Sequence, residues 1–138
     1  MSDSGRWAAL VPELSCSDLA ASVSFYCDML GFARRIERPG FTYISHGGAE
    51  IMLEAQEDGW ATAALEKPYG RGINLQIEVD NAASLSARVT AAGIPLFRPL
   101  ADRWYADGDR EHGQREFLVQ DPDGYLLRFA EPLGTRVV

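Results

Sequence analysis

An internal repeat constrains the fold of this chain more than any other feature of its sequence. Residues 17–32 align without a gap onto residues 79–94, an offset of 62, and the two segments share an Asp, an Ala-Ala-Ser triplet and a Gly in the same order. A shared start, body and end is typical of a duplicated structural unit. The chain is therefore predicted to contain two copies of one supersecondary element.

Each copy of the repeat predicts a helix. Apolar residues recur at helical spacing in both copies, as Leu19, Val23, Tyr26 and Leu30 and as Leu85, Val89 and Ala92. Asp18 and the Asp80–Asn81 pair are typical N-caps, and Gly31 and Gly93 are typical of the position just after a helix. We expect two helices that begin and end at equivalent places.

Strand-like segments surround each predicted helix. Residues 73–79 alternate apolar and polar side chains, which indicates a half-buried strand. The other strand-like segments are 32–38, 41–46 and 49–54 in the first half and 95–100, 115–120 and 125–131 in the second. Together these elements predict an α+β fold. They form a single domain of two βαβββ modules, residues 7–56 and 72–133, joined by a linker, residues 57–71.

A polar segment of the second module, residues 99–114, is expected to form a long loop because it is rich in charged residues and glycine. It contains Trp104 and Tyr105, and the linker between the modules contains Trp60. Aromatic residues in such polar surroundings either cover a small core or contact a ligand. The sequence leaves both interpretations open.

The charge of the chain argues against nucleic acid as a partner. Of 138 residues, 20 are acidic and 13 are basic, and Lys67 is the only lysine. A protein that neutralises phosphates needs a basic face, whereas a net charge of -7 would attract a cationic ligand.

The sequence has no long apolar run, no leader and only two cysteines, Cys16 and Cys27. These features predict a cytoplasmic protein with reduced thiols and no membrane partner.

Two βαβββ modules with "DLAASVSFYCDMLGF" near the start and "DPDGYLLRF" near the end resemble the vicinal oxygen chelate superfamily of glyoxalase I, extradiol dioxygenases and bleomycin-resistance proteins. The resemblance implies curved mixed sheets around a cleft. In the enzymes of the family, the first and last strands of each module supply metal ligands. The corresponding residues here are Val11, Met52, Asn74 and Arg128. Such a set suits no divalent cation, so we expect no metal and no other cofactor.

The alternation of residues 125–130 raises a question about Arg128, which faces away from the apolar side chains of its strand. The resemblance places Arg128 in the cleft. The same strand parity places further polar side chains there, namely Glu13, Glu50, Glu54, Gln76 and Glu78. Carboxylates beside a guanidinium group would form a paired polar lining. The alternative is that this face of the sheet is simply solvated.

The sequence is similar in more detail to the bleomycin-resistance proteins, which are dimers that sequester a drug without altering it. "VPELSCSDL" resembles their first strand, and Phe41 matches an aromatic residue that stacks on the flat rings of the drug. Their second stacking residue, a Trp, is replaced here by Gly113, and Trp104 and Tyr105 lie earlier in the same segment. The resemblance therefore implies a homodimer that binds a small molecule, a cationic glycopeptide antibiotic of the bleomycin type, and that has no catalytic residues. The candidate ligand-binding residues are Phe41, Trp104, Tyr105, Glu13, Glu54, Asn74, Gln76, Glu78, Arg128 and Met52.

Two other functions stay open from the sequence. The first is an enzyme, a glyoxalase-like lyase or isomerase or a dioxygenase relative with a relocated site. Glu13, Glu54 and Glu78 would then supply oxygen ligands or a general base if two of them converge. The second is a binding module for an unidentified small molecule. Pro12, which cannot donate to a central ladder, is compatible with an edge strand.

Overall fold

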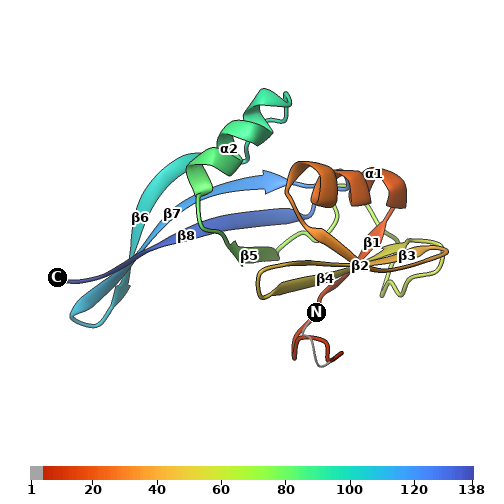
Figure 1. The fold of residues 1–138 in the computed structure, drawn as a ribbon, viewed down its shortest axis with the longest axis horizontal. Coiled ribbons are helices and arrows are strands. Elements are labelled where there is room, and N and C mark those ends of the chain that lie inside the picture. Colours follow the sequence, from red (N-terminus) through yellow and green to blue (C-terminus); the bar gives the residue numbers. More distant parts are fainter. Residues whose placement is uncertain (1–4) are drawn as a thin grey trace. The chain divides into compact units, whose positions relative to one another are not determined.

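The computed structural model describes residues 5–138 and divides the chain into two units. Unit 1 runs to Arg71 and also includes Asp121–Gly124, while unit 2 comprises Gly72–Gln120 and Tyr125–Val138. Each unit contains a four-stranded mixed sheet and a helical segment (Figure 1). The predicted α+β fold of two βαβββ modules is confirmed.

The sheet of unit 1 has the strand order β1 (Glu13–Cys16), β4 (Ala49–Ala55), β3 (Phe41–His46) and β2 (Ala33–Arg38). β1 runs parallel to β4, and the other neighbours are antiparallel. Because β1 is the edge strand, Pro12 at its start leaves the ladder intact, as the sequence predicts. Leu14, Ile44 and Leu53 share the buried face of this sheet.

The helical segment of unit 1 begins as α1 (Leu19–Val23) and continues as a π-helical turn, η1 (Ser24–Met29). The Asp18 carboxylate accepts a hydrogen bond from the Ala21 amide at 3.1 Å, so the predicted N-cap is confirmed. Tyr26 and Leu30 of the predicted apolar stripe are buried. The chain leaves the helix through Gly31, whose φ of 83° is a conformation that favours glycine.

Unit 2 repeats this plan with the strand order β5 (Asn74–Glu78), β8 (Leu126–Val137), β7 (Arg110–Gln120) and β6 (Arg98–Asp107). Helix α2 (Ala82–Ala91) lies over one face of the sheet (Figure 1). Its N-cap is Asn81, which accepts a hydrogen bond from the Ser84 amide at 3.0 Å. The core between helix and sheet includes Val89 and the stacked rings of Phe117 and Phe129, whose centroids are 5.4 Å apart.

The expected long loop at residues 99–114 is wrong. This segment forms most of β6 and the start of β7, a hairpin that turns at Gly108 and Asp109, and its tip lies beside the end of β8 (Figure 1). Cross-strand ion pairs explain why so polar a sequence is extended: Arg115 pairs with Asp102 at 2.8 Å and Arg136 with Glu111 at 2.9 Å. Such partners lie far apart in sequence, so local composition does not reveal them.

Residues 121–124 leave unit 2 between β7 and β8 and pack within unit 1. The buried Asp121 carboxylate accepts hydrogen bonds from the Tyr26 hydroxyl at 2.8 Å and from two backbone amides of the turn at 2.9 and 3.0 Å. The buried Asp123 carboxylate accepts hydrogen bonds from the hydroxyl and, at 3.0 Å, the amide of Ser17. This turn is therefore a polar network inside unit 1.

Both cysteines are buried and unbridged. Burial raises the pKa of the Cys16 thiol to about 11 and also raises the pKa of Cys27. These thiols are therefore packing groups and not activated nucleophiles, as the sequence predicts. No helix within residues 5–138 has the length and apolar character needed to cross a membrane.

Candidate functional site

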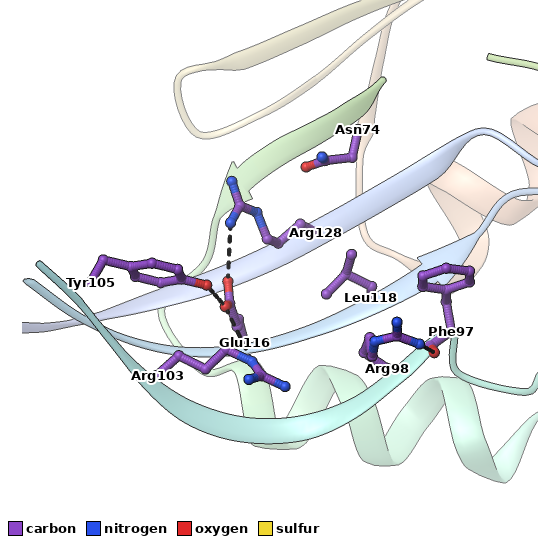
Figure 2. Close-up of a pocket in the computed structure, with 8 residues that line it drawn as sticks. All are labelled: Asn74, Phe97, Arg98, Arg103, Tyr105, Glu116, Leu118 and Arg128. Carbon is purple, nitrogen blue, oxygen red and sulfur yellow. Dashed lines mark hydrogen bonds and ion pairs between the residues drawn. The ribbon is translucent and has the colours of Figure 1, made fainter. Parts of the chain in front are cut away.

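The face of the unit 2 sheet that points away from α2 contains a hollow of about 420 Å³ (Figure 2). The strand register brings its residues together, because Arg128 on β8 lies between Gln76 on β5 and Leu118 on β7. The hollow is lined by Asn74, Phe97, Arg98, Arg103, Tyr105, Glu116, Leu118 and Arg128. Its volume suits a small organic molecule.

Glu116 is the central charged group of the hollow. Its side chain is only 2% exposed, and it accepts a hydrogen bond from the Tyr105 hydroxyl. Arg103 Nε lies 3.7 Å from Glu116 Oε1, and Arg128 Nη1 lies 3.7 Å from Glu116 Oε2. One buried carboxylate thus faces two guanidinium groups (Figure 2). Arg128 is therefore a partly buried component of this hollow, with 29% of its side chain exposed, and not a solvated edge charge.

The Tyr105 hydroxyl is held in its neutral form. Burial is the main cause that raises its pKa, and the hydrogen bond to Glu116 and the negative charge of Glu116 add to the effect. The nearby positive charge of Arg128 acts in the opposite direction. At neutral pH Tyr105 is accordingly a hydrogen-bond donor and an aromatic surface, and it does not serve as a base.

A second polar cluster lies on the face of the unit 1 sheet opposite to Leu14, Ile44 and Leu53. Burial and a hydrogen bond with Glu54, together with the negative charge of Glu54, raise the pKa of Glu13, while Arg38 lowers it. The guanidinium carbon of Arg38 lies 3.9 Å from the centre of the Phe41 ring, and Phe41 is only 3% exposed. Glu13 and Glu54 therefore converge, and the Phe41 ring is covered by protein side chains.

Glu50, on the same strand as Glu54, is engaged by the N-terminal segment. It accepts hydrogen bonds from the Tyr43 hydroxyl and, at 3.1 Å, from the Ala8 amide, and the Trp7 ring lies 4.4 Å from the Tyr43 ring. Burial and Glu50 raise the pKa of Tyr43 to about 12, and the Tyr43 hydrogen bond lowers the pKa of Glu50. The N-terminal residues Trp7 and Ala8 therefore cover part of this face of the sheet.

Glu13→Gln is expected to raise the free energy of unfolding at pH 7.5. A raised carboxyl pKa means that the folded state favours the protonated form, so stability is lost as pH rises through the folded-state pKa. The gain should stay below about 1 kcal/mol because Glu13 is solvent-accessible, and it should shrink as the pH approaches the usual glutamate pKa. Urea unfolding at pH 5 and pH 7.5 measures it. A gain that is equal at both pH values would contradict a raised pKa of Glu13.

The strand register relates the four positions that the resemblance assigns to metal ligands. In unit 1 Met52 pairs with Glu13, two residues after Val11, and in unit 2 Arg128 pairs with Gln76, two residues after Asn74. The two modules are therefore equivalent at these positions. The side chains do not fit a divalent metal, because they offer one neutral amide oxygen and a permanent cation. Across residues 5–138, no group of three or more His, Cys, Asp or Glu side chains could hold a metal ion.

The structure brings some of the predicted site residues together and separates others. Asn74, Tyr105 and Arg128 line the hollow, and Gln76 and Glu78 extend from the same face of β5. Glu13, Phe41, Met52 and Glu54 belong to the sheet of unit 1.

Trp104 is directed to the opposite face of β6 from Tyr105. Its ring lies 3.9 Å from the guanidinium carbon of Arg136 and crosses Gly113 on β7, where a Cβ atom would come within 2.6 Å of it. Gly113 therefore makes room for Trp104. A Trp at position 113 would exclude this packing.

Several residues of the hollow were not predicted. Glu116 and Leu118 on β7 and Arg103 on β6 reach the hollow through antiparallel pairing, while Phe97 and Arg98 lie where β6 begins. A signal for Glu116 was present, because it alternates with the buried Phe117 and Val119 in the strand predicted at 115–120. A charged residue at such a position has to find a partner.

The fold is that of a known superfamily. The model of the glyoxalase/bleomycin resistance protein/dioxygenase superfamily matches residues 9–129, and the chain belongs to that superfamily. It is 29% identical over 135 residues to the bleomycin resistance protein of Geobacillus stearothermophilus, covering 89% of this chain and 96% of that protein. It is 28% identical over 136 residues to the lactoylglutathione lyase of Haemophilus influenzae, covering 89% and 91%. The crystal structure of TioX from Micromonospora sp. ML1 has the same fold, with a TM-score of 0.71 and 22% identity over 90% of this chain and 98% of TioX.

Proposed function

We propose that this protein binds a small organic molecule without a metal and without altering it chemically, and that a bleomycin-type antibiotic is its ligand. The observation that carries the proposal is the set of side chains at the metal-ligand positions, Val11, Met52, Asn74 and Arg128. The resemblance assigns these positions to metal ligands, and their side chains lack the chemistry that a divalent metal needs. Relatives named bleomycin resistance protein support the antibiotic as the ligand.

The polar and aromatic groups suggest which part of such a ligand each would contact. Its cationic part would pair with a carboxylate outside the hollow, at the exposed Glu78 on β5 of the same unit. Its flat rings would stack on aromatic faces, each worth about 0.5–2 kcal/mol. Tyr105 is 39% exposed and offers such a face, whereas Phe41 does so only when Arg38 moves aside.

Calorimetric titration of the chelator-treated protein with metal-free bleomycin tests this function. We expect saturable binding near one drug per chain, and mass spectrometry should recover the drug unchanged. Glu78→Gln should weaken binding severalfold because it removes an exposed carboxylate from the ligand-binding face. Glu111→Gln is the matched control, since Glu111 pairs with Arg136 beside Trp104 on the other face of the hairpin. Undetectable binding, or equal loss in both variants, would reject the assignment.

We also propose that the protein is a homodimer, as the resemblance to bleomycin-resistance proteins implies. Sedimentation equilibrium at micromolar concentration tests this proposal. A species of twice the chain mass is the expected result, and a monomer would contradict the proposed dimer.

A second candidate function is supported by the Glu13–Glu54 pair. Two carboxyl groups that share a proton can act as a general acid and base, and one relative is named lactoylglutathione lyase. An isomerase assay with the hemithioacetal of methylglyoxal and glutathione, with and without added divalent metal, distinguishes this candidate from binding alone. Turnover that is lost in Glu54→Gln would favour the enzyme.

A further inference from the structure

We infer that the hollow of unit 2 is a binding site for a small organic anion that carries a flat apolar group. The inference rests on the proposed binding function and names the ligand class of the hollow. It starts from charge: Arg98, Arg103 and Arg128 line the hollow, and Glu116 is its single acidic lining residue. The hollow therefore has a local charge of about +2 in a chain whose net charge is -7.

Glu116 does not use up the donors of these arginines. Its two ion pairs, with Arg103 and Arg128, are each 3.7 Å long, beyond hydrogen-bond distance. Within the described residues, the buried Arg128 Nε and Glu116 Oε2 have no hydrogen-bond partner. A guanidinium group has five N–H donors, so donors remain for the oxygens of a ligand.

The arrangement of the donors matches an anionic group with two or three oxygens. Figure 2 shows the Arg128 guanidinium between Asn74 and Glu116, with Arg103 beyond Glu116 and Arg98 beside Phe97. Arg128 and Arg103 come from different strands and approach one carboxylate from different directions. A carboxylate, sulfonate or phosphate bound in the hollow would receive charge-assisted hydrogen bonds, which are the strongest kind that these groups make.

Apolar surface beside the arginines points to the rest of the ligand. Phe97 is 45% exposed and Tyr105 is 39% exposed, and Leu118 also lines the hollow. The guanidinium group of Arg98 lies 4.8 Å from the Phe97 ring centre and donates a hydrogen bond to the Phe97 carbonyl at 3.2 Å, so it is held against the aromatic face. A planar group can stack against these surfaces while its charged end meets Arg128.

The size of the hollow and the charge of the chain exclude polyanions from this role. A volume of about 420 Å³ accommodates a drug-sized or smaller molecule, whereas a nucleic acid is disfavoured by the net charge of -7. A purely cationic ligand would be repelled by the arginines. The cationic part of a bleomycin-type drug would therefore bind outside the hollow.

Naphthalene-2-carboxylate and its neutral isostere naphthalene-2-carboxamide test this inference, with binding followed by isothermal titration calorimetry and by NMR signals of the arginine Nε–H groups. We expect the carboxylate to bind about tenfold more tightly than the carboxamide, and the difference to shrink as NaCl is raised. Arg128→Gln and, separately, the more exposed Arg103→Gln should each lower carboxylate affinity by about tenfold. Arg136→Gln is the matched control, because Arg136 covers Trp104 on the opposite hairpin face, and it should change affinity by less than about twofold.

Glu116→Gln tests most directly whether the hollow prefers an anionic ligand. Since Glu116 competes with a ligand for the same guanidinium groups, its neutralisation should tighten binding of the carboxylate. The inference is overturned if 2-naphthylmethylammonium binds as well as the carboxylate, if Glu116→Gln weakens the carboxylate, or if no arginine signal shifts at millimolar ligand. Carboxylate binding without bleomycin binding would reject only the antibiotic. Bleomycin binding without carboxylate binding would reject only the anion site.

Discussion

Replacing Asp121 with alanine is expected to lower the free energy of unfolding by about 3–5 kcal/mol. The carboxylate is 5% exposed and accepts three hydrogen bonds, one from the Tyr26 hydroxyl and two from backbone amides of its own turn. Its removal takes an acceptor from the fully buried Tyr26 hydroxyl and from the Asp123 amide, while the Gly124 amide keeps the Asp121 carbonyl oxygen at 2.9 Å. Urea unfolding followed by circular dichroism measures the loss.

Tyr26→Phe is the control for this prediction because it removes a single hydrogen bond and keeps the aromatic packing against Phe25 and Phe32. It should cost about 1–2 kcal/mol, clearly less than Asp121→Ala. The double variant should lose less than the sum of the two single losses, because both remove the same contact. A loss below about 1 kcal/mol in Asp121→Ala would show that the network is not structurally important.

Gly124→Ala is expected to destabilise the protein by more than about 3 kcal/mol. Gly124 has a φ of 101°, and a Cβ atom there would lie 2.5 Å from the Cβ and 2.6 Å from the Cα of Pro68. Since the second atom belongs to the backbone, relief requires a main-chain movement in unit 1. Thermal unfolding by differential scanning calorimetry would report the change.

Gly134→Ala is the control that separates the cost of the backbone conformation from the cost of the steric clash with Pro68. Gly134 on β8 has a similar φ of 92°, but a Cβ atom there would meet nothing within 4 Å. Its cost should be only about 1–2 kcal/mol, which reflects the backbone conformation alone. If both variants lose the same amount, the contact with Pro68 has no energetic consequence.

The helices were predictable because their signals are local. Asp18 and Asn81 cap their own helices within three residues, and Val23 and Leu85 occupy equivalent buried positions at the offset of 62. The hairpin of β6 and β7 was not predictable in the same way. Its polar residues are stabilised by partners such as Arg115 with Asp102, which lie 13 residues apart, and a composition rule assigns such a segment to a loop.

The candidate site was also predictable only in part, where the signals are local. Strand parity was enough to direct Arg128 and Asn74 to the face that carries the hollow. Parity alone could not identify Glu116 and Arg103 as neighbours of Arg128, because that depends on the register of three antiparallel strands. The acidity of the whole chain also suggested a cationic ligand, whereas the hollow itself collects arginines. Net charge describes a surface average and does not determine the charge of one site.

The turn at residues 121–124 also bears on how this protein is made. Because translation proceeds from the N-terminus, the strands and helix of unit 1 leave the ribosome well before Asp121 and Asp123. Until then, the Tyr26 hydroxyl and the Ser17 amide lack the carboxylates that accept their hydrogen bonds. The unit synthesised first is thus completed only after most of unit 2 has emerged.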